Sequence, residues 1–219
     1  MVYLSYELSE STPLYGGSKD VKLVQARQMI KGDTCNIMNL SFPTHCGTHI
    51  DLPYHFDPEG QTLSDYSADP WLFDKIEVID ISGKVNDKQM IKQDMFPQFN
   101  KKDIDLLLIK TGYGQYRGTD RYTMTPPGIA SEVADWLRVT HPTVRCVGMD
   151  LISVSSFSNR EEGRRAHRAF LAPESGKPIL LLEDVKLEHN GPYERVIIAP
   201  LLIEGADGAP CTVFGFEGR

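Results

Sequence analysis

Three features of the sequence predict a strand-rich α/β fold. Residues 105–111 form a continuous apolar run, which is typical of a strand buried on both faces, and 143–151 are expected to form another buried strand. Several other segments alternate apolar and polar residues, as half-buried strands do. Residues 126–139 carry apolar side chains at helical spacing, with Thr125 placed to cap the helix and Pro126 suited to its first turn. At 219 residues and 41% hydrophobic content, the chain fits one domain, residues 1–219, with a sizeable core.

The elements can be predicted in order along the chain. An alternating strand opens it, and two further alternating runs flank Lys31-Gly32-Asp33, a hairpin signal. Residues 63–73 are weakly helical at best, and a short helix over 90–99 is expected to stop near Pro97. Predicted strands cover residues 2–8, 21–29, 34–42, 75–81, 105–111, 143–151, 177–185, 194–203 and 210–216. The remaining helices are expected over 126–139 and 160–171, and strands outnumber helices.

Composition excludes several function classes. A net charge of −7 and a pI near 5.4 argue against nucleic-acid binding and against a polybasic membrane surface. The dense basic run Arg160 to Arg168 contains Glu161 and Glu162, which favours a solvated helix face. We find no apolar signal segment behind Met1 and no apolar run long enough to span a bilayer. We therefore expect a cytoplasmic protein with reduced cysteines that acts on a small molecule.

The most informative stretch is Thr44 to Asp57, which reads T-H-C-G-T-H-I-D-L-P-Y-H-F-D. It contains His45, His49, Asp51 and His55, so half of the six histidines lie here. One histidine alone is more often structural than functional. Three histidines and an aspartate in a segment punctuated by glycine and proline instead indicate a metal site or an acid/base site.

The local geometry of this stretch can also be predicted. Pro43, Gly47 and Pro53 disfavour a helix, so extended chain is expected, with alternate residues facing one way. His45, His49 and Asp51 then share a side, Gly47 leaves room for an ion, and His55 returns from a loop after Pro53. Cys46 would point away from that side, which favours a structural thiol.

Nitrogen and oxygen ligands without a thiolate suit Zn²⁺ or Mn²⁺. A bound divalent ion lowers the pKa of its water toward ~7 and can polarise a carbonyl group. An imidazole whose unperturbed pKa is about 6.5 can accept and donate a proton near neutral pH. The composition of the stretch therefore fits a metal site with a histidine able to transfer protons beside it.

His45 to Phe56 resembles, position for position, the H-x-G-T-H-x-D-x-P-x-H-F pattern of the metal-dependent cyclase-like hydrolases, which include bacterial kynurenine formamidase and isatin hydrolase. The resemblance extends over nearly the whole chain, in the family's order. Further blocks that resemble the family are the L-S-x-x-x-P-L-Y-G-G loop near the start and the segments at 106–112, 147–154, 166–171, 179–185 and 200–211. The resemblance implies a swivelling β/β/α domain and an assembly that is a homodimer or a homotetramer.

The resemblance also implies roles for single residues. His45, His49 and Asp51 match the ligands of a first metal. His167 matches a ligand of a second metal, which Glu183 and Asp51 would bridge to the first, giving one or two ions per chain. His55 matches the general acid/base. The function implied is an arylformamidase-like amidohydrolase that cleaves a small amide or cyclic amide.

Tyr15 is the main departure from the kynurenine formamidase pattern. That enzyme has a tryptophan in a W-P-G-D-like loop where this chain has Tyr15-Gly16-Gly17-Ser18, so a phenol would replace the indole that contacts an aromatic substrate. We predict that Tyr15 contacts substrate, with a loop aromatic packed on the core as the alternative.

Two other functions remain open at this stage. His49, Asp51 and the distant His167 also fit the facial triad of a non-haem Fe(II) oxygenase, although that triad does not need His45 or His55. A non-catalytic small-molecule-binding protein on the same fold is the other alternative, because fold does not fix function.

Overall fold

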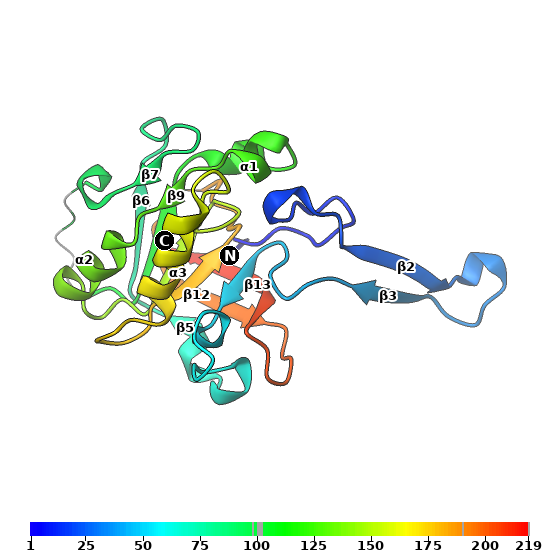
Figure 1. Cartoon of the computed structure of the whole chain (residues 1–219). Coiled ribbons are helices and arrows are strands. Elements are labelled where there is room, and N and C mark those ends of the chain that lie inside the picture. Colours follow the sequence, from blue (N-terminus) through cyan, green and yellow to red (C-terminus); the bar gives the residue numbers. More distant parts are fainter. Residues whose placement is uncertain (98, 100–102, 190, 219) are drawn as a thin grey trace.

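The computed structural model describes residues 1–97, 99, 103–189 and 191–218, and its centre is one large mixed β-sheet (Figure 1). Across the sheet the strands are β5 (Leu72–Phe73), β12 (Tyr193–Pro200), β13 (Gly208–Glu217), β4 (His49–Asp51), β11 (Leu180–Glu183), β10 (Cys146–Met149), β8 (Leu106–Lys110) and β6 (Ile76–Asp80). A short β1 (Val2–Tyr3) pairs with β13. The sheet curls so far that β12 approaches β6, and the barrel nearly closes.

Strand direction divides this sheet into two parts. Strands β6, β8, β10 and β11 run parallel to one another, whereas β4 is antiparallel to both of its neighbours, β11 and β13. The short strand β4 therefore joins the parallel part of the sheet to the antiparallel part. The stretch Thr44 to Asp57, predicted from the sequence to hold a metal, runs through this central strand.

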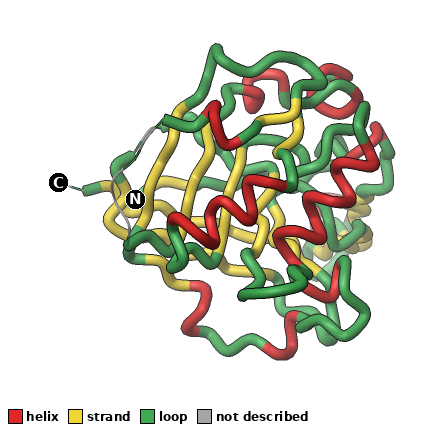
Figure 2. Tube along the Cα trace, turned by 60° about the vertical axis from the view of Figure 1, so that its left-hand side comes forward, coloured by secondary structure: helices red, strands yellow, loops and turns green. Residues whose placement is uncertain are grey.

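Helices cover one face of the parallel strands. Helix α2 (Glu132–Thr140) packs against α3 (Arg160–Leu171), and Figure 2 shows both crossing the same face of the sheet. Leu107 and Ile109 of β8 enter the core beneath these helices, while Leu106 and Leu108 enter a second core on the opposite face. This alternation explains the continuous apolar run, because both faces of β8 are buried.

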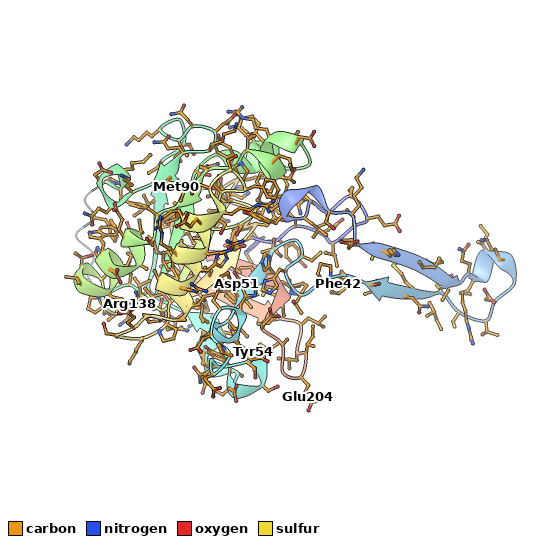
Figure 3. The ribbon with its side chains drawn as sticks, in the orientation of Figure 1. Phe42, Asp51, Tyr54, Met90, Arg138 and Glu204 are labelled. Carbon is orange, nitrogen blue, oxygen red and sulfur yellow. The ribbon has the colours of Figure 1, made fainter. Side chains whose placement is uncertain are left out.

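A two-stranded arm projects from the body (Figures 1 and 3). It consists of β2 (Lys22–Arg27) and β3 (Ile37–Ser41), paired antiparallel, with a 3-10 turn at Met29–Lys31 near its tip. Every side chain of β3 is exposed. The hairpin predicted around Gly32 is therefore confirmed, but it has no core of its own.

Three local predictions were wrong. The helix expected over 90–99 is instead strand β7 (Met90–Ile91) followed by a 3-10 turn at Gln93–Met95, and residue 98 lies outside the described residues. Strand β7 pairs with β9 (Gly128–Ile129). Because β9 occupies residues that were expected to be helical, the helix α2 begins only at Glu132 rather than at 126. Helix α1 (Asp120–Met124) lies in a stretch for which no element was predicted.

The fold class expected from the sequence is confirmed: a strand-rich α/β sheet with few helices. The predicted strand at 2–8 shortens to β1, while helix 160–171 matches α3 at both ends. Among the described residues, we find no helix that combines the length and apolar character needed to cross a membrane.

Candidate metal centre

The register of the sheet around β4 brings together residues that are far apart in the sequence. His49 and Asp51 point to one face of β4, as alternate residues of a strand do. Glu183 of β11 pairs directly opposite His49, so its carboxylate lies on the same face. On the other side of β4, Gly208 pairs with Asp51 and places Asp207 at the edge of the cluster.

His45 reaches the cluster from outside the strand. The extended geometry predicted for 45–51 is wrong before residue 49, because Gly47 has φ +61° and turns the chain there. Glycine is favoured at residue 47 because the backbone is left-handed there, and not because an ion needs room beside it. The His45 ring lies where a Cβ on Gly208 would come within 2.8 Å of it, so glycine is required at 208 for the ring to fit.

Backbone carbonyls orient two of the imidazoles. The His49 Nδ1–H donates to the Gly47 carbonyl over 2.8 Å, and the His167 Nδ1–H donates to the Gly163 carbonyl over 2.9 Å. Both Nε2 atoms are thereby left free of backbone contacts and face the carboxylates of Asp51 and Glu183 at 3.2 to 3.8 Å. This arrangement is typical of metal-binding histidines, in which one nitrogen is fixed by the protein and the other binds the ion.

The two buried carboxylates are satisfied to different degrees. Glu183 Oε1 accepts hydrogen bonds from the Val154 N–H at 2.6 Å and the Ser153 hydroxyl at 3.2 Å. Asp51 Oδ1 contacts His45, but Asp51 Oδ2 is buried and has no hydrogen-bond partner among the described residues. A buried polar atom without a partner is costly unless something else binds it. A divalent cation fits this position.

His55 stands at the rim of the cluster rather than inside it. It ends the 3-10 turn Pro53–His55, and its Nδ1 lies 2.9 Å from Asp207 Oδ2. The same carboxylate oxygen lies 2.8 Å from His45 Nε2, and the two rings are 3.9 Å apart between centroids. Phe56, next in the chain, stacks on His167 at 4.4 Å and covers it. Asp207 thus holds His45 and His55 side by side.

The charges of the cluster favour bound cations. Burial lowers the pKa of His45, but the Asp51 and Asp207 carboxylates outweigh it and raise that pKa to about 10. Burial likewise lowers the pKa values of His49 and His167, and Asp51 and Glu183 reverse the shift. Hydrogen bonds from His45 and His55 hold the pKa of Asp207 well below its usual range. Buried carboxylates therefore draw protons onto the imidazoles, and a metal ion can replace these protons.

Candidate ligand atoms come close enough to share an ion. Three sets have all their ligand atoms within 4.8 Å of one another, and Asp51 belongs to two of them. These sets are His45, His49 and Asp51; Asp51, His55 and His167; and His45, His55 and Asp207. The structure thus brings together all five residues predicted as ligands and the predicted acid/base, while their individual roles stay predictions.

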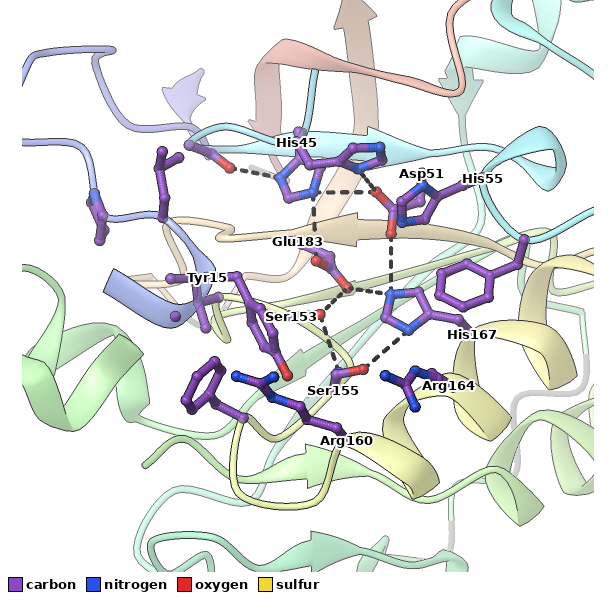
Figure 4. A pocket seen from close by; sticks show the side chains of 18 residues that line it. Tyr15, His45, Asp51, His55, Ser153, Ser155, Arg160, Arg164, His167 and Glu183 are labelled. Carbon is purple, nitrogen blue, oxygen red and sulfur yellow. Dashed lines mark hydrogen bonds and ion pairs between the residues drawn. The ribbon is translucent and has the colours of Figure 1, made fainter. Parts of the chain in front are cut away.

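The cluster forms one end of a cavity of about 610 Å³ (Figure 4). We call this the ligand end, and it consists of His45, His49, Asp51, His167 and Glu183. The opposite part, which we call the arginine end, consists of Tyr15, Phe157, Arg160 and Arg164. Tyr15 opens the 3-10 turn Tyr15–Gly17, and its ring meets Phe157 edge-on with centroids 5.3 Å apart. Tyr15 therefore lines the cavity, as expected for a residue that contacts substrate.

Sequence reasoning missed the two arginines and Asp207. The basic run in α3 was interpreted as a solvated helix face, yet Arg160 and Arg164 line the cavity together with His167. Their spacing of i, i+4 and i+7 puts all three on one helix face, a signal present in the sequence. Asp207 lies in the C-terminal block, and only the pairing of β13 with β4 shows that it contacts histidines. Cys46 is buried beside Leu14 and Val21, where burial raises the pKa of its thiol to about 11, as suits a structural cysteine.

Comparison with known proteins shows the family of this chain. The model of a family described as putative cyclase matches residues 2–156. This chain belongs to the cyclase family. Kynurenine formamidase from Bacillus cytotoxicus is 31% identical over 177 residues, which cover 80% of this chain and 77% of that protein. Kynurenine formamidase from Bacillus cereus is 29% identical over the same shares of the two chains.

Solved structures of the cyclase family share the fold. Isatin hydrolase A from Labrenzia aggregata superposes with a TM-score of 0.79 at 19% identity, covering 99% of this chain and 93% of that one. A potential metal-dependent hydrolase with cyclase activity gives a TM-score of 0.76 at 22% identity over 100% of this chain and 98% of that one. The resemblance drawn from His45 to Phe56 is thereby confirmed for both family and fold.

Proposed function

We propose that this protein is a metal-dependent amidohydrolase that cleaves the C–N bond of a small amide or cyclic amide. The observation that carries the proposal is the buried Asp51 Oδ2, which has no hydrogen-bond partner among the described residues. His167 Nε2 lies 3.6 Å from this oxygen, and His49 Nε2 lies 3.2 Å from the other carboxylate oxygen, Oδ1. Kynurenine formamidase and isatin hydrolase, the names of its relatives, both denote hydrolysis of an amide, which supports the reaction class.

The side chains of the ligand end are the proposed metal ligands. His45, His49 and Asp51 would hold one metal, and His167 and Glu183 would hold a second with Asp51 shared between them. His45 would have to exchange one of its two carboxylate contacts for the ion. Nitrogen and oxygen donors favour Zn²⁺ or Mn²⁺, either of which supplies Lewis-acid polarisation of a carbonyl and lowers the pKa of a bound water.

His55 is the proposed general acid/base. Its Nδ1 is engaged by Asp207, so its Nε2 is available to a substrate in the cavity. We propose that Nε2 accepts a proton from the attacking water and delivers it to the leaving nitrogen of the amide. Asp207 holds the ring in place during both transfers, as carboxylates do for other catalytic histidines. Phe56 shields the neighbouring His167 from water.

The decisive experiment combines metal content with substrate turnover. Protein purified without added metal is analysed by elemental mass spectrometry and then assayed against N-formylkynurenine, isatin and a panel of small amides, with and without chelator. One to two zinc or manganese ions per chain with chelator-sensitive hydrolysis would support the proposal. Iron without hydrolysis would favour the oxygenase. A protein that stays metal-free and inactive after reconstitution would leave only a binding function.

We also propose that the protein assembles as a homodimer or homotetramer, and the β2–β3 arm supports this. A two-stranded ribbon with both faces in water is at best marginally stable. Met38 and Leu40, which share one face of β3, are each more than half exposed, at 51% and 57%. A second copy of the chain would cover these side chains.

Light scattering coupled to size-exclusion chromatography tests this assembly. We expect at least a dimer, and we expect Met38→Glu combined with Leu40→Glu to shift it toward monomer. Asn39→Glu places the same charge on the other face of the same strand and should have a smaller effect. A wild-type monomer at all concentrations would contradict the proposed assembly.

A further inference from the structure

The arginine end of the cavity carries two positive charges that have no role in the proposed metal binding or proton transfer. Arg160, Arg164 and His167 project from one face of α3 into the same cavity. A helix rises about 1.5 Å per residue, so along its axis Arg164 lies about 4.5 Å, and Arg160 about 10 Å, before His167. Two guanidinium groups therefore lie one to two helical turns from the predicted ligand His167 (Figure 4).

The acidic residues of α3 form their contacts with groups other than Arg160 and Arg164. Glu161 and Glu162 pair with Arg165, at 3.7 and 2.7 Å, and Glu162 also accepts the Ser131 N–H at 2.9 Å. Among the described residues, neither Arg160 nor Arg164 forms an ion pair with a carboxylate. The Arg160 guanidinium instead lies 4.0 Å from the centre of the Phe157 ring, a cation–π contact that leaves its N–H groups free to bind an anion.

Tyr15 lies beside Arg160 in the cavity lining that also includes Arg164 (Figure 4). Burial raises the pKa of the Tyr15 hydroxyl, whereas Arg160 and Arg164 both lower it and Glu183 raises it. The hydroxyl therefore feels the positive field of both guanidinium groups and the negative field of the ligand end. A substrate lying in the cavity would experience the same change in sign along its length.

The cavity also has an apolar lining. Leu14 and Ile152 line it together with Tyr15 and Phe157 of the arginine end. The approach of Gly16 to Phe157 is so close that a Cβ at residue 16 would lie 2.8 Å from the ring, so the Tyr15 turn and Phe157 form one packed wall. Such a wall suits a flat apolar group such as an aromatic ring.

We propose that Arg160 and Arg164 bind a carboxylate on the substrate, so that the preferred substrates are small aromatic amides bearing an anionic group away from the scissile bond. Guanidinium groups bind carboxylates through paired, charge-assisted hydrogen bonds. With the carboxylate held at the arginine end, the amide is directed to the ligand end. This inference rests on the proposed amidohydrolase function.

The test compares a matched pair of amides. Formate release from 4-formamidobenzoate and from its neutral analogue 4-formamidobenzamide is measured with the zinc-loaded wild type and with Arg160→Gln, Arg164→Gln and the double variant. Arg165→Gln, which removes a charge from another face of the same helix, is the control. We expect wild type to prefer the benzoate in kcat/KM, each single variant to lose about three- to tenfold with it, and the double variant about thirtyfold. The benzamide should change by less than about twofold.

A binding measurement separates failure of this inference from failure of the proposed function. Calorimetry compares 4-aminobenzoate with neutral 4-aminobenzamide on the same zinc-loaded proteins. If no amide is hydrolysed but the benzoate binds better and loses this advantage in the double variant, the anion site stands and the amidohydrolase proposal falls. If wild type treats the two ligands alike, or if the arginine variants weaken both members of each pair equally, the anion site is wrong.

Discussion

At the ligand end of the cavity four of the five side chains are almost fully buried and the backbone fixes two of them, whereas at the arginine end the side chains are long and more exposed. His49 and Asp51 are 4% and 1% exposed, while Tyr15 is 36% exposed. Backbone carbonyls fix His49 and His167, but Arg160, among the described residues, is held by its contact with the Phe157 ring. The difference shows how one cavity can combine a rigid reaction centre with an adaptable recognition surface. Variants at the ligand end should abolish turnover of every substrate, and variants at the arginine end should only change which substrate is preferred.

Asp51→Asn should have the largest effect. Asp51 faces His45, His49 and His167 and is the carboxylate proposed to be shared between two ions. An amide oxygen carries no charge to bind them, so we expect loss of most of the bound metal and a fall in kcat/KM of at least about a thousandfold for all amides. Elemental mass spectrometry and turnover assays check both. Asp57→Asn, in the same segment, is the matched control, and a metal-replete Asp51→Asn protein would argue against the shared-ligand role.

His55→Ala should separate chemistry from metal binding. His55 lies at the rim, where its Nδ1 contacts Asp207 rather than the buried carboxylates of Asp51 and Glu183. We expect turnover to fall about 100- to 10,000-fold, as is usual for loss of a general acid/base, with metal content near normal. Metal analysis of the purified variant distinguishes a role in proton transfer from a role in metal binding. Loss of the metal would make His55 a ligand and its assignment as acid/base wrong.

The stability of the metal-free protein should depend on pH through His45. Asp51 and Asp207 raise its pKa in the folded protein to about 10, above the unfolded value of 6.5. The contribution of protonated His45 to the stability of the folded protein is therefore complete below pH 6.5 and is lost as pH rises through about 10. Melting temperatures in chelator should fall between pH 6.5 and 9.5, and Asp207→Asn should flatten this fall.

The metal-loaded protein provides the contrast for that measurement. A ligating imidazole must be unprotonated at the atom that binds the ion, so metal binding should release protons, and the loaded protein should lose less stability over the same pH range. Proton release can be measured directly by titrating zinc into the chelator-free protein in a weakly buffered dye solution. Uptake of protons, or equal pH dependence with and without metal, would contradict the exchange of protons for metal.

The two ends of the cavity also differ in how well the sequence predicts them. His45, His49, Asp51 and His55 are close in sequence, so their identity and spacing alone indicate a shared site. Glu183 and His167 could be added only through family resemblance, because no local pattern shows that β11 pairs with β4. Asp207 depends on strand pairing alone and was missed.

Local physics also explains which elements were predicted well. Residues 106–110 enter two cores in alternation, so their apolar run defines a strand whatever lies around it. The segments at 90–91 and 128–129 are strands only because they pair with each other, a long-range contact with no local signal. The arginines of α3 have the composition of a solvated face, and only the position of the helix beside the cavity makes them part of the site.

Tyr15→Ala should have the smallest effect and tests the aromatic wall of the arginine end. The Tyr15 ring lines the cavity edge-on to Phe157, and its loss would remove a contact with the ring of a substrate that is worth about 0.5–1.5 kcal/mol. We expect KM for aromatic amides to rise about three- to tenfold with kcat and metal content nearly unchanged, because Tyr15 is not in the ligand end. Tyr15→Phe keeps the ring and should stay close to wild type. If kcat instead falls with KM unchanged, the tyrosine hydroxyl takes part in the reaction, and the separation between recognition and chemistry along this cavity does not hold.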